Sequence, residues 1–385
     1  MDSDYMFCPK PECRHHTLKS QGNDWYYHYG YHSTKAFGKV RRYKCKSCGK
    51  TFSDQTFELN YWLKIKTEFK ALGKELNSLS SCCFAARNED LSADSIRIRY
   101  DRIARNSLFL QAELTKDIKI NEPLVADGLE SYTRNKYFPT NLNVLMGDGT
   151  YFVYYFNQSH SKRKGRITKA QKIRMESEYI GKCLSRSYIK KMFTKLIDYL
   201  EGKCDKETLL LNTDENTAYA GVVNRWNIRA KRKKEGERSS ADTYMPIIEH
   251  RVTPSTAPRT KENPLKAVNY FDRQIRKDIP SYRRRTISQA KNDRNKLSRV
   301  AFYVATHNFF KPFLISSNAK QTEKKHSDFV IGDNPQKQYW IEKFFTKRFF
   351  HSFTELPEYF ENIWFKRTPT PFKNEADPVP KFASQ

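Results

Sequence analysis

The first regular pattern along the chain is a helical spacing of apolar residues between residues 61 and 106. In the first helix of this segment the repeating positions are Trp62, Ile65, Phe69, Leu72 and Leu76. The stretch SLSSCCFAARNED predicts a second, short helix, and Ser92 is placed to cap a third. We therefore expect three helices in succession.

The third of these helices combines apolar and basic positions. Its apolar face consists of Ile96, Tyr100 and Ile103, so we expect its arginines to project elsewhere. These arginines are Arg97, Arg99, Arg102 and Arg105. Three helices with a basic last member favour a helix-turn-helix over residues 58–110, whose last helix enters the major groove of DNA. A plain amphipathic helix with solvated arginines is the alternative.

Short apolar runs replace the helical spacing after residue 118. EPLVAD (122–127) predicts a strand, and NLNVLMGDGTYFVYYF (141–156) predicts two strands that turn at Gly147-Asp148-Gly149. Residues 186–203 predict an amphipathic helix, and TLLLNTD (208–214) predicts another buried strand. If the first and fourth strands are parallel, Asp127 and Asp214 lie side by side at strand ends.

A later helix, over residues 263–279, carries an acid on its apolar stripe. The stripe is formed by Leu265, Val268, Ile275 and Ile279. Asp272 lies on this stripe, and a carboxylate on a buried face is unfavourable unless it is paired or binds a metal. Pairing with Arg276, four residues further on, is the structural alternative. Asp278 lies off the stripe and is a weaker candidate.

The remaining segments are charged or aromatic. Residues 159–178 and 229–242 are dense in charge, and we interpret the second as an exposed basic insertion. Residues 281–313 predict a long basic helix that could carry the substrate backbone. Residues 314–385 are rich in Phe, Tyr and Trp and end in a Pro-rich stretch that we expect to be mobile.

Charge indicates the class of partner. The chain has 385 residues, with 70 Lys+Arg against 43 Asp+Glu and a net charge of +27. With 38% hydrophobic residues it can form a core, and a basic globular chain is typical of proteins that bind a polyanion. The sequence has no apolar run of membrane-spanning length, and MDSDYMFCPK is unlike a secretory signal. We therefore expect a cytoplasmic protein whose cysteines are reduced.

Four of the eight cysteines form two closely spaced pairs, CPKPEC and CKSCGK. Cys8 and Cys13 make up the first pair, and Cys45 and Cys48 the second. Two such turns supply four thiolates for a structural zinc site, which would stabilise a small β-ribbon over residues 1–57. His15 and His16 are possible substitute ligands.

Basic residues surround the second cysteine pair, and we expect them to contact DNA phosphates. They are Arg41, Arg42, Lys44, Lys46 and Lys50. A solvated positive rim is the alternative interpretation.

The acids of the second half suggest a divalent-metal site. Paired carboxylates at a sheet edge bind hard cations, and two such ions can act on both oxygens of a phosphodiester displacement. Other acids that could serve as ligands are Glu130, Glu215 and Glu262. The chain contains no HExxH, P-loop or GxGxxG motif, which leaves metalloprotease, NTPase and dinucleotide-binding functions without support.

Taken in order, these motifs resemble a known family. CPKPEC, GKVRRYKCKSCGKTFS, LVADG, LLLNTDENTAYA, VNYFDRQIRKD and VATHNFFKPF resemble the bacterial insertion-sequence transposases with an N-terminal zinc ribbon and a DDE domain. The resemblance implies an RNase H-like α/β domain over 118–313, in which Asp127, Asp214 and Asp272 bind two Mg²⁺. The family more often has Glu at the third position. It also implies that Arg276 lies near DNA.

The resemblance further implies a homo-oligomer, associated with the bacterial nucleoid, that binds terminal inverted repeats of double-stranded DNA and cuts and joins strands. The ribbon and the helix-turn-helix, with Arg97, Arg99 and Arg102, would provide the binding. The runner-up is a catalytically inactive DNA-binding regulator derived from a transposase, and a third possibility is an RNA-binding or structural zinc-ribbon protein.

Overall fold

The structure is a computed structural model of the chain. It describes residues 5–19, 22, 24–161, 163, 165–178, 186–235, 244–283, 288–313, 324–372 and 379–385. Two units are distinguished by their internal contacts. The N-terminal unit comprises Met1–Glu113, Pro335–Lys366 and Pro378–Gln385, and the sheet unit comprises Leu114–Asn334 and Arg367–Asp377.

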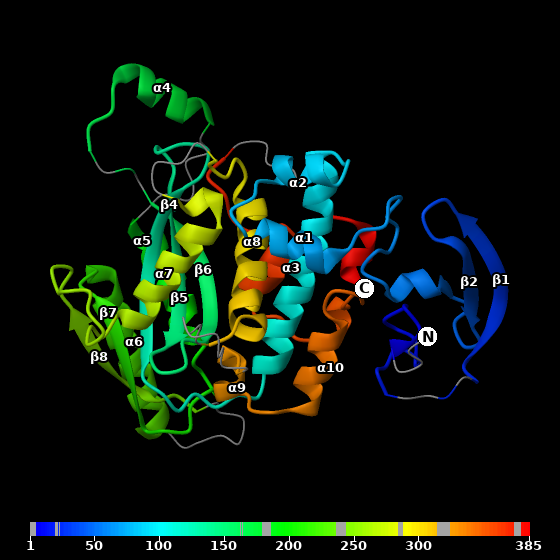
Figure 1. The fold of residues 1–385 in the computed structure, drawn as a ribbon. Helices are drawn as coiled ribbons and strands as arrows, with labels where there is room; N and C mark the ends of the chain where they lie inside the picture. Colours follow the sequence, from blue (N-terminus) through cyan, green and yellow to red (C-terminus); the bar gives the residue numbers. More distant parts are fainter. Residues whose placement is uncertain are drawn as a thin grey trace, which may run out of the picture. The chain divides into compact units, whose positions relative to one another are not determined.

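The N-terminal unit begins with the expected ribbon (Figure 1). Its antiparallel strands are β1 (Tyr26–Thr34), β2 (Gly38–Cys45) and β3 (Thr51–Ser53). Phe52 stacks between Trp25 and Tyr43, each with ring centroids 5.4 Å away. These few rings are a very small core, which explains why a ribbon of this size needs additional cross-linking.

Three helices follow, although the first is shorter than the apolar spacing predicts. They are α1 (Phe69–Leu76), α2 (Cys82–Asn88) and α3 (Ala93–Thr115). Trp62 and Ile65 precede α1 and are exposed, so their placement on its apolar face was wrong. Asn60 explains the late start, because its side-chain amide accepts from the Thr67 N–H (2.9 Å) and donates to the Thr67 carbonyl (3.1 Å), which closes a loop.

The start and apolar face of α3 agree with the prediction. The Ser92 hydroxyl accepts a hydrogen bond from the Ser95 N–H at 3.1 Å, which is an N-cap. Ile96, Tyr100 and Ile103 are all buried. The helix is longer than predicted, since it continues to Thr115.

The aromatic C-terminal region contributes to the core of the N-terminal unit. Its helical elements there are α10 (Pro335–Lys343), η5 (His351–Phe353), α11 (Glu358–Trp364) and η6 (Lys381–Ser384). Trp340 packs against Phe109 of α3 with ring centroids 4.7 Å apart. The Trp364 indole donates to the Ala383 carbonyl at 2.7 Å. Residues 379–385 are therefore held by the unit, which corrects the expectation of a mobile tail; residues 373–378 lie outside the described part.

The sheet unit is built on five strands in the order β6-β5-β4-β7-β8. They are β4 (Leu124–Tyr132), β5 (Pro139–Gly147), β6 (Val153–His160), β7 (Thr208–Asp214) and β8 (Ile247–Thr253). The first three form an antiparallel meander, and β4, β7 and β8 are parallel. The hairpin and the parallel pairing of the first and fourth strands are thus confirmed, whereas β8 was not anticipated.

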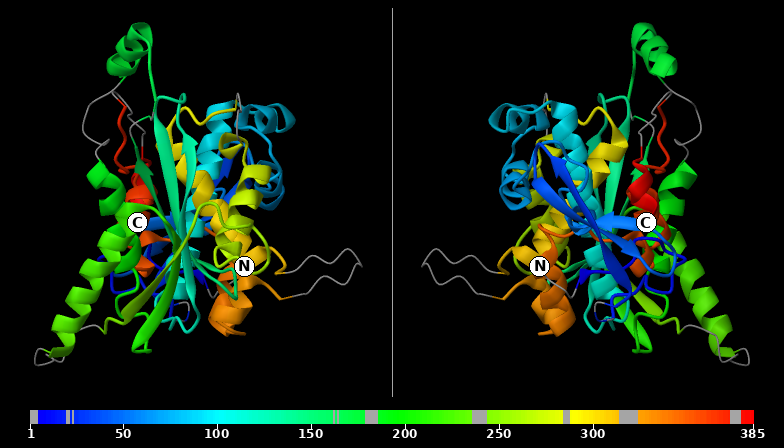
Figure 2. Two further views of the ribbon diagram at one scale, coloured as in Figure 1. Left: turned by 90° about the vertical axis from the view of Figure 1, so that its left-hand side faces the viewer. Right: turned by 90° about the vertical axis from the view of Figure 1, so that its right-hand side faces the viewer.

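Helices cover both faces of this sheet (Figures 1 and 2). The helical elements of the unit are α4 (Lys169–Glu178), α5 (Arg186–Asp198), α6 (Thr217–Glu235), α7 (Lys266–Asp278), η3 (Pro280–Tyr282), α8 (Asp293–Ala305), η4 (Thr306–Phe310) and α9 (His326–Val330). On β6, Asn157 donates to the Met192 carbonyl of α5, whereas His160 contacts Asp293 of α8. These two side chains point to opposite faces of the sheet, so α5 and α8 cover different faces. This mixed α/β architecture is compatible with an RNase H-like fold.

Two charged segments are more regular than their composition predicts. Residues 229–235 continue helix α6 rather than forming an insertion, because Arg229 and Lys233 pair with Asp198 (2.9 Å) and Glu201 (2.7 Å). Residues 236–243 of that segment lie outside the described part. The predicted basic helix over 281–313 is shortened to α8 and η4, and most of α8 is buried. Among the described residues, no helix combines the length and apolarity needed to cross a membrane.

Candidate functional site

The four cysteines of the two pairs converge in the N-terminal unit. Their sulfur atoms all lie within 4.8 Å of one another, with Sγ–Sγ separations of 3.4 Å for Cys8–Cys48 and 3.7 Å for Cys13–Cys45. A tetrahedron of thiolates around zinc, with Zn–S bonds of about 2.3 Å, has edges of about 3.8 Å. The donor set and its spacing therefore fit a zinc ion.

Local backbone structure produces this convergence. The Cys13 N–H bonds to the Lys10 carbonyl (3.0 Å), and the Gly49 N–H bonds to the Cys45 carbonyl (3.0 Å), which closes both turns. Gly49 adopts φ +70°, where a side chain would be strained. Burial raises the pKa of the Cys8 thiol, so a bound cation is what would keep it as a thiolate.

The two histidines proposed as substitute ligands have other partners. His15 Nε2 lies 2.8 Å from the Ser47 hydroxyl. His16 lies 2.7 Å from the Cys8 carbonyl through Nδ1 and 2.6 Å from the Ser352 hydroxyl through Nε2. The four-cysteine set is therefore the better description of the site.

The basic residues around the second cysteine pair are accessible to a partner. Arg41, Lys46 and Lys50 are exposed, while Arg42 and Lys44 are half-buried. Their contact with DNA phosphates stays a prediction that their exposure permits.

The arginines of α3 divide differently from the prediction. Arg97 is exposed and pairs with Asp94 one turn earlier. Arg99 is buried and donates to the carbonyls of Ser95 and Ile65, each at 3.0 Å, and buried Arg102 donates to the Leu59 carbonyl at 2.9 Å. The expectation that Arg99 and Arg102 project from the unit to contact DNA was therefore wrong.

Arg99 and Arg102 are buried because other segments of the N-terminal unit enclose α3 on several sides. Arg105 is also buried, and its Nε donates at 3.3 Å to the carbonyl of Trp364, which lies far along the sequence in the C-terminal region. The Arg102 guanidinium lies 4.8 Å from the Phe382 ring centroid. Burial lowers the pKa of Arg102 to about 9. These side chains thus hold chain segments together through backbone carbonyls.

In the sheet unit, two of the three predicted acids lie on neighbouring parallel strands. Ala126 of β4 is opposite Thr213 of β7, so Asp127 and Asp214 follow at the next position of the register. Asp214 is the last residue of β7, as expected, but β4 continues past Asp127 to Tyr132, which corrects its assignment to a strand end. The pairing partner β5 sustains this extension.

Helix α7 packs against β4 and brings the third acid, Asp272, within electrostatic range of Asp127. Burial raises the pKa of Asp272 to about 8, and the charge of Asp127 adds to this effect. Its Oδ1 atom is buried without a hydrogen-bond partner. Arg276 and Arg259 act in the opposite direction by stabilising the carboxylate form.

The pKa values of the other two carboxyls are also raised, and burial is again the largest cause. Burial raises the pKa of Asp127 to about 6, with the charge of Asp214 as the second cause and the Gly128 N–H (2.6 Å) opposing. Burial also raises the pKa of Asp214, against a hydrogen bond from the Asn216 N–H at 3.0 Å. Shared charge repulsion of this kind is typical of carboxylate sites that bind cations or protons.

Tyr219 of α6 is a common neighbour of the three acids. Burial raises its pKa, and the charges of Asp127, Asp214 and Asp272 each add to this. Its ring stacks on Phe193 with centroids 4.0 Å apart, which fixes its position. Sequence inspection missed this residue, since a buried tyrosine in an amphipathic helix has no distinctive signal.

The fit of divalent ions to these acids rests on donor chemistry. Carboxylate oxygens are the ligands of Mg²⁺, and a cation would relieve both the mutual repulsion and the unpartnered Asp272 Oδ1. Within the described part of the chain, the four cysteines alone bring three or more ligand atoms within 4.8 Å of one another. The aspartates are therefore electrostatic neighbours in a looser arrangement than the zinc ligands.

Nearby acids are less suited to the same role. Asp278 accepts a hydrogen bond from the Tyr303 hydroxyl at 2.8 Å, and Glu215 accepts one from Ser255 at 2.7 Å. Glu262 is exposed. Glu130 is exposed on β4 and lines a groove of about 400 Å³.

That groove is predominantly basic. Besides Glu130 its charged lining residues are Lys136, Arg163, Arg276 and Arg283. Arg276 also stabilises the carboxylate forms of Asp127 and Asp272, so it connects the groove electrostatically to the acids. An anionic polymer lying in this groove would contact Arg276, which is one turn along α7 from Asp272.

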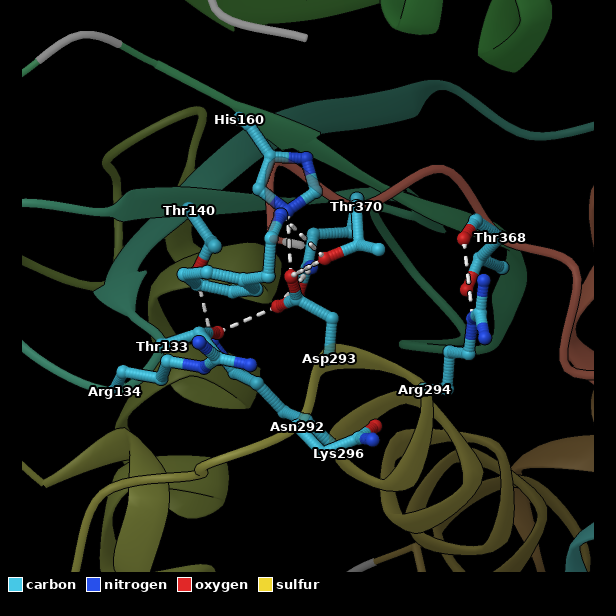
Figure 3. Close-up of polar contacts among 12 residues, drawn as sticks. Thr133, Arg134, Thr140, His160, Asn292, Asp293, Arg294, Lys296, Thr368 and Thr370 are labelled. Atoms are coloured by element: carbon cyan, nitrogen blue, oxygen red, sulfur yellow. Dashed lines mark hydrogen bonds and ion pairs between the residues drawn. The ribbon is translucent and has the colours of Figure 1, made fainter. Parts of the chain in front are cut away.

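A second buried acid, Asp293, belongs to a different network (Figure 3). It is fully buried, and its carboxylate lies 2.8 Å from His160 Nε2 and accepts from the side chains of Thr133 and Gln158. These partners lower its pKa despite its burial. Sequence inspection missed the network because Asp293 resembles an ordinary residue of a helix first turn.

Lys296, one turn along α8, is also buried and donates to Thr140 at 2.7 Å. Burial lowers its pKa to about 8. Figure 3 shows the Asp293 carboxylate pointing at His160 and Thr370, which come from β6 and the Arg367–Asp377 segment. The network therefore joins α8, the sheet and this segment inside one unit.

Comparisons with known proteins assign no family to these sites. Neither a scan against protein-family models nor a search of curated proteins gives a match to this chain.

Proposed function

We propose that the chain is a DNA transposase of an insertion sequence, which binds terminal inverted repeats and catalyses strand cleavage and strand transfer. The observation that carries this proposal is the grouping of Asp127, Asp214 and Asp272 on β4, β7 and α7 of a sheet with RNase H-like strand order. The raised pKa of each acid supports a site built to hold a cation. The basic groove beside them supports a polyanionic substrate.

The three aspartates would hold two Mg²⁺ ions. When bound, such ions polarise the scissile phosphate and stabilise the attacking and leaving oxygens. The chain's own contribution is positioning. Arg276 and the other cations of the groove would hold the DNA backbone, so that the scissile phosphate faces the carboxylates.

The reaction proceeds in two displacements at phosphorus. Water attacks the phosphodiester at the element end in line and releases a strand with a 3′-hydroxyl. That hydroxyl then attacks a phosphodiester of target DNA, forming one P–O bond as another breaks. No covalent intermediate with the protein is needed, and joining requires two ends held together, so we expect an oligomer.

The N-terminal unit would supply binding rather than chemistry. A four-thiolate zinc site has no open coordination position, so zinc there is structural. The exposed cations of the ribbon and Arg97 are available for phosphate contacts, whereas the buried Arg99 and Arg102 are not.

The test uses purified full-length protein and a labelled duplex that carries the inverted repeat flanking the gene. We expect cleavage in Mg²⁺ or Mn²⁺ by the wild type and none by Asp127→Asn or Asp214→Asn, with end binding retained in a gel-shift assay. Asp278→Asn is the matched control, because Asp278 also lies on α7 but is bonded to Tyr303. We expect it to cleave normally.

Two results would count against the proposal. Full cleavage by Asp214→Asn would exclude the carboxylate mechanism. Specific binding by the wild type with no cleavage in either metal would favour the inactive DNA-binding regulator. The feature that supports this alternative is Asp272, whose side chain is shorter than the Glu more often found in the family.

A further inference from the structure

Strand β1 of the ribbon has three exposed tyrosines that contribute nothing to its core. Tyr27, Tyr29 and Tyr31 of β1 are 41%, 44% and 50% exposed. A β-bulge at Tyr29-Gly30, with Gly30 at φ +74°, interrupts the pairing of β1 with β2. Solvent-exposed aromatic rings side by side on one strand indicate a contact surface.

The bulge places these tyrosines on two different faces. Tyr27 is opposite Lys44, whereas Tyr31 is opposite Arg41. Because side chains alternate along β2, Lys44 and Arg41 point to opposite faces, and so do their partners. The ring contacts agree, since Arg42 and Lys44 lie over Tyr29 while Arg41 lies over Tyr31.

The face that carries Tyr27 and Tyr29 is compact and cationic. The two rings have centroids 6.4 Å apart. Arg42 and Lys44 lie 5.0 Å and 5.5 Å from the Tyr29 centroid. The sequences of β1, β2 and β3 contain no Asp or Glu, so these cations have no anionic partner within the ribbon sheet.

A groove of about 680 Å³ continues from this face within the N-terminal unit. Arg42 belongs to both, since it lies over Tyr29 and lines the groove. The groove also exposes Lys35, Lys64 and Trp62, and its lining contains no carboxylate. A volume of this size accommodates one or two nucleotides by comparison with small-molecule sites.

Trp62 is an unusual residue for a surface loop. Its side chain is 75% exposed, and its backbone adopts φ +61°, which is strained for a bulky side chain. The Asn60–Thr67 hydrogen bonds hold the loop in this form. An exposed indole on a strained backbone, beside a cationic groove, is typical of a binding site rather than of a residue that packs in a core.

We infer that this ribbon face and groove bind unpaired DNA. One base stacks on Tyr29, a neighbouring base enters the groove against Trp62, and Arg42, Lys44 and Lys64 contact the phosphates. Stacking on protein rings requires a free base face, which a duplex conceals, so single strands are preferred. The inference involves only the N-terminal unit and does not depend on the carboxylate chemistry proposed above.

Intrinsic fluorescence provides a direct readout. Of the five tryptophans, Trp25, Trp226, Trp340 and Trp364 are at most 5% exposed, so accessible emission comes from Trp62. We expect oligothymidylate to quench the emission of the zinc-loaded full-length protein, and Trp62→Phe to remove the effect. A duplex carrying the same number of phosphates should quench far less.

Affinity measurements with labelled oligothymidylate test the face itself. Tyr29→Ala should weaken binding about 5- to 100-fold, which is typical of losing one base-stacking ring. Tyr31→Ala is the matched control, because it removes the same side chain with similar exposure from the opposite face, and it should leave affinity unchanged. Zinc content should be equal in both variants, which shows that the ribbon has folded.

Several outcomes would overturn the inference. These are equal quenching by duplex and single strand, wild-type affinity of Tyr29→Ala, an equal loss with Tyr31→Ala, and competition by polyglutamate as strong as by oligothymidylate. Asp214→Asn should bind single strands normally, so a failure of the cleavage proposal would leave this result intact.

Discussion

Replacing Asp272 by Asn should stabilise the protein in the absence of divalent metal. Asp272 Oδ1 is buried without a hydrogen-bond partner, and its carboxylate faces the charge of Asp127. A native protein that keeps such a group has accepted a loss of stability, which is expected of a site shaped for a cation. Asn has nearly the same shape and carries no charge.

The size of the effect follows from proton linkage. Unfolded chains lose the Asp272 proton near the ordinary value of 3.8, whereas the folded protein retains it up to about 8. Between these values the unfolded state binds fewer protons, so wild-type stability falls as pH rises. At about 1.4 kcal/mol per pH unit, the stability that the wild type has lost by pH 7 is at most about 4 kcal/mol.

The Asn side chain recovers only part of this. Its buried amide lacks full hydrogen bonding, which costs about 1–3 kcal/mol. We therefore expect a net gain of about 2 kcal/mol at pH 7, or roughly 4–8 °C in the melting temperature of a unit of this size. Below pH 4 the gain should turn into a loss of about 1–3 kcal/mol, because Asp272 is then protonated in both states and only the cost of the buried amide remains.

Thermal unfolding followed by circular dichroism from pH 4 to 9, in metal-depleted buffer with zinc retained, measures this directly. Millimolar Mg²⁺ should raise the melting temperature of the wild type, because it binds the native state alone, and have much less effect on Asp272→Asn. Asp278→Asn controls for loss of a carboxylate on α7. A variant that is destabilised at pH 8, or that responds to Mg²⁺ as the wild type does, would refute the reasoning.

Three further predictions concern other parts of the molecule. Cys45→Ser should release zinc, detected by a chromogenic chelator, and unfold the ribbon while the sheet unit keeps its own transition. Asp293→Asn should destabilise the sheet unit by about 3–5 kcal/mol at pH 7, because it leaves the buried cation Lys296 without a compensating charge and His160 without its carboxylate partner. Since the pKa of Asp293 is below its ordinary value of 3.8, this contribution is complete at neutral pH, begins to fall below about pH 4 and decreases further as the pH approaches the lowered pKa. Urea titrations at pH 7 and at a series of pH values below 4 would show this. Arg102→Ala should lower the melting temperature of the N-terminal unit, whereas Arg97→Ala should leave it unchanged and affect DNA affinity alone.

Local patterns were sufficient for much of the fold. The Gly-Asp-Gly turn between two apolar runs predicted the β5–β6 hairpin, and the cysteine spacing predicted the ribbon. Strand β8 escaped notice because its sequence IIEHRVT mixes charged and apolar residues on a sheet edge. Helix α1 was extended too far because the apolar spacing at Trp62 and Ile65 is real, but the Asn60–Thr67 hydrogen bonds override it.

The positions of the candidate site residues were predictable where they depend on neighbours in a regular element. Parallel pairing of β4 and β7 brings Asp127 beside Asp214, and the stripe of α7 places Asp272 on a buried face. The arginines of α3 were misjudged because what buries them comes from far along the chain. Arg102 contacts Phe382, almost three hundred residues later, which no local pattern reveals.

Asp272 and Asp293 show why burial of an acid does not by itself indicate function. Both lie in the sheet unit, and both carboxylates are removed from water. Asp293 is surrounded by donors, among them His160 and Thr133, and its pKa falls, so the ionised form stabilises the fold. Asp272 has a like charge nearby and an unpartnered oxygen, and its pKa rises, so the ionised form destabilises the fold and a bound cation would offset this cost. The same Asp→Asn change should therefore have opposite signs at the two positions, and the position where it stabilises is the one to test for metal binding.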